Sequence, residues 1–119
     1  MLPEEKDVSY LWDIVDAAKS IKQFVQGCTF EEYMENTLLQ AAVERKIEII
    51  GEAARRLSES FRQRYADIPW KLIIAQRNVL AHEYGEINQE RIWNVVVERI
   101  PELIAALEPL LPPAPEDTE

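Results

Sequence analysis

The chain has 119 residues, 47% of them apolar, which suits one globular domain. Its formal net charge of −9 argues against a general nucleic-acid-binding protein, because phosphate contacts normally come from a basic surface. A single cysteine, Cys28, excludes an internal disulfide and a cysteine zinc site, and no apolar run reaches the ~20 residues of a membrane span. Together with the lack of a signal peptide, this predicts a cytoplasmic protein.

The periodicity of apolar residues predicts helices throughout, and no alternating run is typical of a strand. Residues 7–26 carry apolar side chains every three or four positions, and Gly27 is expected to end this first helix. Thr29 and Glu32 have the spacing of a capping box, which predicts a second helix that runs to about Ser58. Because its apolar face is wide, this helix should lie at the centre of a bundle.

In the second half of the chain, the sequence pattern predicts shorter helices. A polar connection holds a short helix around Phe61, and a third helix follows it. Asn88 is expected to cap the last helix, which Pro101 should kink or split. We therefore expect an all-α antiparallel bundle of four to five helices over residues 1–111, followed by a disordered acidic tail over residues 112–119.

The candidate chemistry centres on His82, the one histidine of the chain and the side-chain type whose ordinary pKa lies near neutrality. Arg77 precedes it by five residues and Tyr84 follows it by two. Residues of these types can cleave RNA without a metal. His82 would take the proton of the 2′-hydroxyl as general base, or protonate the leaving 5′-oxygen as general acid. Arg77 would hold the phosphate, and Asn78 would orient His82 or bind a ribose hydroxyl. Residues 45–77 are locally basic, with a net charge of +4.

Helical geometry does not bring these side chains together within one chain. At about 100° per residue, Tyr84 lies nearly over Arg77, whereas His82 is rotated by roughly 140°. Either the helix ends near His82, as Gly85 indicates, or two chains assemble the site, and we favour both. A two-fold dimer would also supply the two proton carriers that acid–base cleavage requires.

A purely structural interpretation of the same segment stays open. A single histidine near a helix end is often a capping or hydrogen-bonding residue rather than a catalytic one. In that case Arg77 would pair with Glu83 or Glu86, and Tyr84 would be a half-buried core residue. The basic side chains upstream would then be ordinary solvated helix faces.

Residues 77–84 (RNVLAHEY) resemble the R-N-x-x-x-H-x-Y motif of the HepT family of HEPN domains. The similarity extends to residues 45–54 (RKIEIIGEAA), to residues 68–70 (IPW) and to the Ile-Asn and Ile-Trp pairs within residues 87–93. It covers about residues 7–110. The R-x4-H spacing alone is weak, but its combination with these flanks is specific.

The resemblance implies a HEPN-type helical bundle that forms a homodimer with its active cleft at the interface. It implies a ribonuclease toxin with Arg77 and His82 as catalytic residues, Asn78 in support, RNA as substrate, and no metal or cofactor. The antitoxin would be an MNT-type nucleotidyltransferase that transfers AMP from ATP to Tyr84. No membrane or DNA partner is expected. The alternatives are a non-catalytic HEPN subunit that binds or regulates a nucleotidyltransferase, and a structural bundle with a fortuitous motif.

Overall fold

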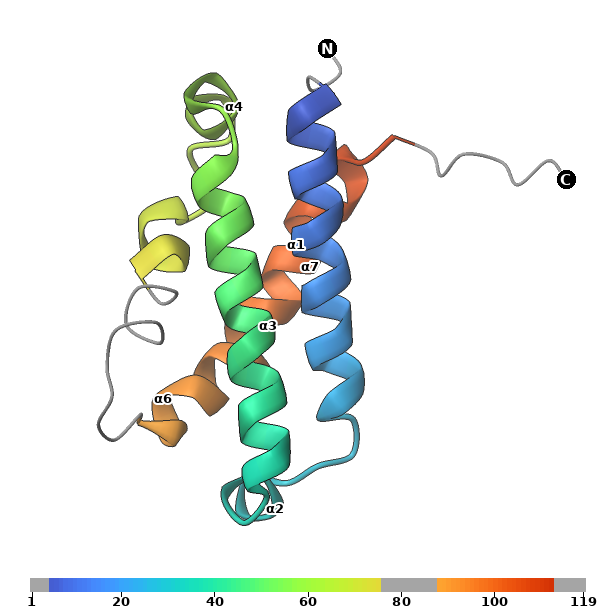
Figure 1. The fold of residues 1–119 in the computed structure, drawn as a ribbon, viewed down its shortest axis with the longest axis vertical. Coiled ribbons are helices and arrows are strands. Elements are labelled where there is room, and N and C mark those ends of the chain that lie inside the picture. Colours follow the sequence, from blue (N-terminus) through green and yellow to red (C-terminus); the bar gives the residue numbers. More distant parts are fainter. Residues whose placement is uncertain (1–4, 76–87, 113–119) are drawn as a thin grey trace, which may run out of the picture.

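The computed structural model describes residues 5–75 and 88–112, and every regular element in this part of the chain is helical (Figure 1). The all-α prediction is confirmed, with the short α2 and α4 lying between the longer helices. In chain order the elements are α1 (Glu5–Phe24), α2 (Phe30–Met34), α3 (Thr37–Arg56), α4 (Glu59–Arg64), a helical segment at residues 70–75, α6 (Gln89–Asn94), the π-helical turn η1 (Val95–Arg99), α7 (Ile100–Leu107) and the 3-10 turn η2 (Glu108–Leu110).

The core lies where α1 and α3 pack side by side in opposite directions, with α7 crossing behind α1 (Figure 1). Gly27 ends the first helical stretch as expected, and its positive φ of 74° is a conformation that glycine adopts without a steric cost. Each fully buried leucine or isoleucine contributes about 1.5–3 kcal/mol by leaving water. The apolar stripes that meet in this core comprise Leu11, Ile14, Ala18, Ile21, Val43, Ile47, Ile50, Ala54, Leu103 and Leu107.

The predicted second helix is interrupted, so the prediction of one helix from Thr29 to about residue 58 is wrong. Its start is confirmed: the Thr29 N–H donates to Glu32 Oε1 at 2.9 Å, and Glu32 N–H donates to Thr29 Oγ1 at 3.1 Å. The helix then stops at Met34. Asn36 adopts an extended conformation, and its Oδ1 accepts a hydrogen bond from Leu39 N at 2.9 Å, which caps a new helix.

A buried carboxylate joins the beginning of α1 to the beginning of α4. The short helix expected around Phe61 is present, and Ser58 caps it by accepting a hydrogen bond from the Phe61 N–H at 3.1 Å. Asp7 is only 3% exposed and accepts from Ser58 N at 2.8 Å and from Ser58 Oγ at 2.7 Å. The two charge-assisted hydrogen bonds therefore fix the corner at which α3 turns into α4.

The last helix begins and divides as expected. Asn88 Oδ1 accepts a hydrogen bond from Arg91 N at 3.1 Å, which confirms the predicted N-cap. A π-helical turn over Val95–Arg99 comes directly before Pro101, which occupies the first turn of α7. Proline has no N–H to donate and its ring collides with the carbonyl four residues earlier, so a wider turn accommodates it. Residues 113–119 lie outside the described part, and the acidic tail stays a prediction.

Candidate active site

The predicted site residues, three for RNA cleavage and one for modification, all fall within residues 76–87, which lie outside the described residues. The predicted roles of Arg77, Asn78, His82 and Tyr84 therefore stay predictions. The structure does describe both elements to which this stretch is joined. The helical segment at residues 70–75 and the helix α6 lie on the same side of α3 (Figure 1).

Aromatic packing holds the element on the N-terminal side of the motif. Trp70 is 7% exposed, and its indole Nε1–H donates to the Tyr65 carbonyl at 3.1 Å. Phe61 lies between the two aromatic rings, 4.7 Å from Tyr65 and 6.2 Å from Trp70 between ring centroids. The backbone N–H of Ile73 donates to the carbonyl of Pro69 at 3.1 Å, which begins the helical turn. The motif therefore follows a segment that is fixed to α4.

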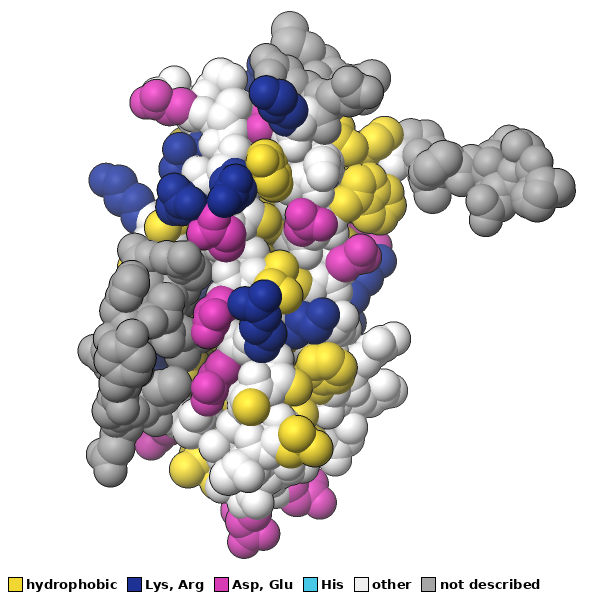
Figure 2. All heavy atoms as spheres, viewed as in Figure 1, with side chains coloured by type: hydrophobic (Ala, Val, Ile, Leu, Met, Phe, Trp, Pro, Cys, Tyr) yellow, Lys and Arg dark blue, Asp and Glu magenta, His cyan; other side chains and the backbone are white. Residues whose placement is uncertain are grey.

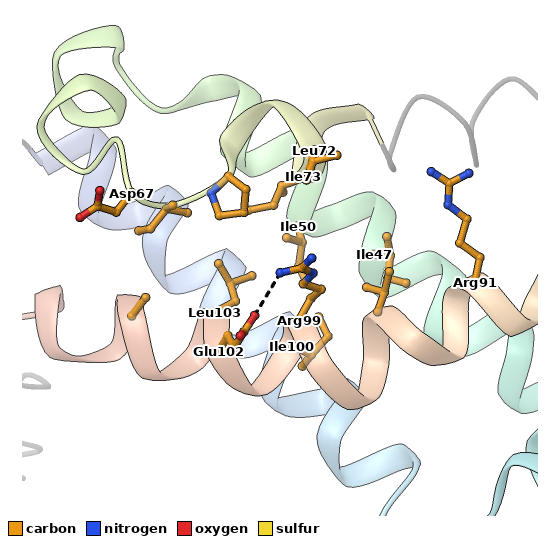
Figure 3. A pocket seen from close by; sticks show the side chains of 14 residues that line it. Ile47, Ile50, Asp67, Leu72, Ile73, Arg91, Arg99, Ile100, Glu102 and Leu103 are labelled. Carbon is orange, nitrogen blue, oxygen red and sulfur yellow. Dashed lines mark hydrogen bonds and ion pairs between the residues drawn. The ribbon is translucent and has the colours of Figure 1, made fainter.

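A groove of about 670 Å³ lies between α3, the segment at residues 67–73 and the ridge formed by α6, η1 and α7 (Figure 3). Its walls are mostly aliphatic, and the guanidinium group of Arg99 lies close to Ile50 in this view (Figure 3). Arg99 Nη1 lies 3.4 Å from Glu102 Oε1 in an exposed pair, which contributes little to stability. The other charged residues of the rim are Asp67 and Arg91.

The segment at residues 45–54, which carries part of the family resemblance, divides into an inner and an outer face of α3. The outer face carries Arg45, Glu48 and Glu52, which line a second hollow of about 350 Å³ between α1 and α3. The inner face packs in the core and presents Ile47, Ile50, Gly51, Ala53 and Ala54. Half of this signature therefore serves packing, and the other half is available at the surface.

Some of the basic side chains at residues 45–77 are paired with a carboxylate of the same segment. Hydrogen bonds from Arg55 at 2.8 Å and from Arg56 at 2.7 Å lower the pKa of Glu52 to about 2. Basic and acidic side chains alternate over the face that α1 and α3 present (Figure 2). The arginines of this face are therefore engaged by carboxylates, which weakens their attraction for RNA phosphates.

Two other kinds of site find no support in residues 5–75 and 88–112. No group of three or more histidine, cysteine, aspartate or glutamate side chains in this part of the chain is arranged to hold a metal ion. None of the helices described is both long and apolar enough to cross a membrane. The groove between α3, residues 67–73 and the ridge of α6, η1 and α7 is one concave feature that the described residues form.

Known proteins resemble this chain over most of its length. The family model "Ribonuclease HepT-like" matches residues 14–110. "Putative RNase MJ0127" of Methanocaldococcus jannaschii is 38% identical over 108 residues, which cover 90% of this chain and 89% of that protein. "Probable ribonuclease HepT" of Thermococcus cleftensis is 35% identical over 101 residues, covering 85% and 92%. No solved structure is significantly similar. The chain belongs to the HepT-like ribonuclease family.

Proposed function

We propose that this chain is an endoribonuclease that cuts RNA without a metal ion and acts as the toxin of a toxin–antitoxin pair. The observation that carries the proposal is the complete R-N-x-x-x-H-x-Y motif at residues 77–84, inside the family match over residues 14–110. The relatives at 35–38% identity bear ribonuclease names, which supports RNA as the substrate.

In the proposed reaction the RNA supplies its own nucleophile. The 2′-oxygen attacks the adjacent phosphorus, the bond from phosphorus to the 5′-oxygen breaks, and the products are a 2′,3′-cyclic phosphate and a 5′-hydroxyl. His82 takes the proton from the 2′-hydroxyl or gives one to the leaving 5′-oxygen. Arg77 pairs with the phosphate oxygens and stabilises the charge that builds on them, while Asn78 orients His82 or a ribose hydroxyl.

A homodimer completes the site in this proposal. One chain supplies one histidine, and acid–base cleavage uses two proton carriers, which two copies of His82 provide. In this proposal the second chain covers part of the groove between α3, residues 67–73 and α7, which Leu72 lines and where it is 55% exposed. A sedimentation experiment in which a stable monomer keeps full activity would rule out the shared site.

The test of the enzymatic proposal is incubation of the purified protein with total RNA in the presence of EDTA. We expect the wild type to cleave RNA, since no metal takes part, and His82→Ala to leave the RNA intact because the proton carrier is missing. Fragments would be separated by electrophoresis. If the wild type cleaves no RNA, the proposal that the chain is an enzyme is wrong. If both proteins cleave RNA equally, His82 takes no part in the reaction.

We further propose that an MNT-type nucleotidyltransferase inactivates the chain through Tyr84. The phenol oxygen of Tyr84 would attack the α-phosphorus of ATP, pyrophosphate would leave, and the phenolic proton would pass to a base of the transferase. The attached AMP places negative charge and bulk two residues from His82, where an RNA phosphate would otherwise bind. Arg77 would then pair with the AMP phosphate in place of the substrate.

The modification is tested by intact mass after incubation with the transferase and ATP. Wild type is expected to gain one or more AMP masses and to lose RNA cleavage in parallel. Tyr84→Phe has no nucleophilic oxygen, so it should keep its mass and its activity. The same mass additions on Tyr84→Phe would show that another residue is the acceptor.

The net charge of −9 favours one alternative, in which the chain is a non-catalytic subunit that binds or regulates a nucleotidyltransferase. Pairing of Arg55 and Arg56 with Glu52 leaves fewer free cations for RNA, which points in the same direction. A wild type that forms a stable complex with the transferase but cleaves no RNA in EDTA would establish this alternative over the toxin.

A further inference from the structure

Three polar side chains tie the first residue of α6 to both α2 and α3. The hydroxyl of Tyr33 donates to Gln89 Oε1 at 2.6 Å. The amide nitrogen of Gln89 in turn donates to Glu44 Oε2 at 2.5 Å. Tyr33 comes from α2, Glu44 from α3 and Gln89 from the start of α6. The chain of hydrogen bonds therefore joins α6 to two helices that precede it by 45 and 56 positions at the bonded residues.

The Tyr33 end of this connection is held by burial and by two further contacts. Tyr33 is fully buried, and its ring lies against Trp93 of α6 with 5.1 Å between ring centroids. The side-chain amide of Gln40 donates to the Tyr33 carbonyl at 2.9 Å, which holds α2 on α3. Burial, and then the charge of Glu44, raise the pKa of the Tyr33 phenol, so the hydroxyl stays protonated as the donor.

The connection meets α6 close to the motif in the sequence. Gln89 follows Tyr84 by five residues, and the neighbouring Asn88 caps α6 through the Arg91 N–H at 3.1 Å. The start of α6 is therefore held by side chains outside the motif. A displacement of catalytic groups by about 1 Å can cost roughly 10²-fold in rate, so this junction matters for any chemistry at residues 77–84.

We infer that Tyr33, Gln89 and Glu44 are positioning residues that hold the C-terminal end of the motif segment in its cleavage-competent placement. This inference rests on the proposed ribonuclease function, because that function places the chemistry at residues 77–84. The three side chains touch no substrate; they act through the backbone at the start of α6. The Tyr33 ring already contacts Trp93, so packing alone does not require the Tyr33 hydroxyl.

Tyr33→Phe removes the hydroxyl and keeps the ring, so it separates positioning from packing. We expect kcat for cleavage of a defined RNA to fall about 10-fold while KM stays within about twofold, since placement of the catalytic groups changes and substrate contacts do not. The melting temperature reports general destabilisation. A kcat within about twofold of wild type would overturn the inference.

A swap of the other two partners gives a matched rescue. Gln89→Glu puts a carboxylate against Glu44 and should lower kcat as much as Tyr33→Phe does. In the double variant Glu44→Gln/Gln89→Glu, the amide at position 44 donates to the carboxylate at position 89, which still accepts from Tyr33. We expect kcat to return to within roughly threefold of wild type, as for a coupled pair. Failure of the double variant to recover would overturn the role of this pair.

Amide hydrogen exchange tests the same inference without an assay of RNA cleavage. In Tyr33→Phe, exchange should accelerate at residues 77–94, while the amides of α1 exchange at the wild-type rate. If the wild type cleaves no RNA, the proposed function fails, but this exchange pattern still decides whether the three residues hold the segment. Unchanged exchange at residues 77–94 would overturn the inference in either case.

Discussion

Replacing Arg77 by alanine is expected to lower kcat for RNA cleavage by about 10²–10³-fold, the usual effect of removing one charge-stabilising donor. The guanidinium group would contribute only as negative charge builds on the phosphate oxygens, so kcat falls more than KM changes. Single-turnover cleavage of an end-labelled RNA in EDTA measures the effect.

Arg77→Lys is the matched control for this substitution. Lysine keeps the positive charge but lacks the planar fork that pairs with two phosphate oxygens, so an intermediate rate is expected. Both variants should keep the helical circular dichroism of the wild type, which separates chemistry from folding. Full activity of Arg77→Ala would instead favour the structural interpretation, in which this arginine pairs with a nearby glutamate.

Local signals predicted most of the fold because they depend on a few neighbouring residues. The reciprocal hydrogen bonds of Thr29 and Glu32 need only three residues of separation, and the structure contains both. Pro101 disturbs a helix by its own covalent geometry, so the split after the π-helical turn was also predictable. The inward side chains of α1 and α3 follow directly from apolar periodicity.

The break between α2 and α3 was missed because its cause is not local. Asn36 is compatible with the middle of a helix or with a cap, and the apolar pattern continues through it. The choice is made where α2 docks: Tyr33 is buried against Trp93 and bonded to Gln89, which is 56 positions away in the sequence. No pattern within a single helix contains that contact, so sequence reasoning found neither the break nor the network.

The candidate site shows the same division between local pattern and spatial arrangement. The motif at residues 77–84 was found because its residue types and spacing are distinctive within one short segment. Its helical geometry indicated half of a site, which a second chain would complete. The groove of the described part could not be predicted, because its walls come from α3, from residues 67–73 and from α7. These elements meet only after the bundle has folded.

Replacing Asp7 by alanine is expected to destabilise the protein by about 2–4 kcal/mol, because the N–H of Ser58 would lose its charged acceptor in a partly buried place. The Ser58 hydroxyl would lose the same partner, and the turn from α3 into α4 would loosen. For a domain of this size such a loss lowers Tm by about 10 °C. Thermal or urea unfolding followed by circular dichroism measures it.

Two further variants on α1 define what the Asp7 result means. Asp7→Asn keeps an oxygen that can accept from Ser58 N but loses the charge, so about half of the destabilisation is expected. Asp16→Ala removes a carboxylate from the exposed face of the same helix and should change the unfolding free energy by less than about 0.5 kcal/mol. Equal effects of Asp7→Ala and Asp16→Ala would mean that removal of helix charge, rather than the bond to Ser58, sets the stability. A large loss of unfolding free energy for Asp7→Ala alone would mean that the bonds to Ser58 hold α1 against the corner between α3 and α4. This contact is remote in sequence from the motif.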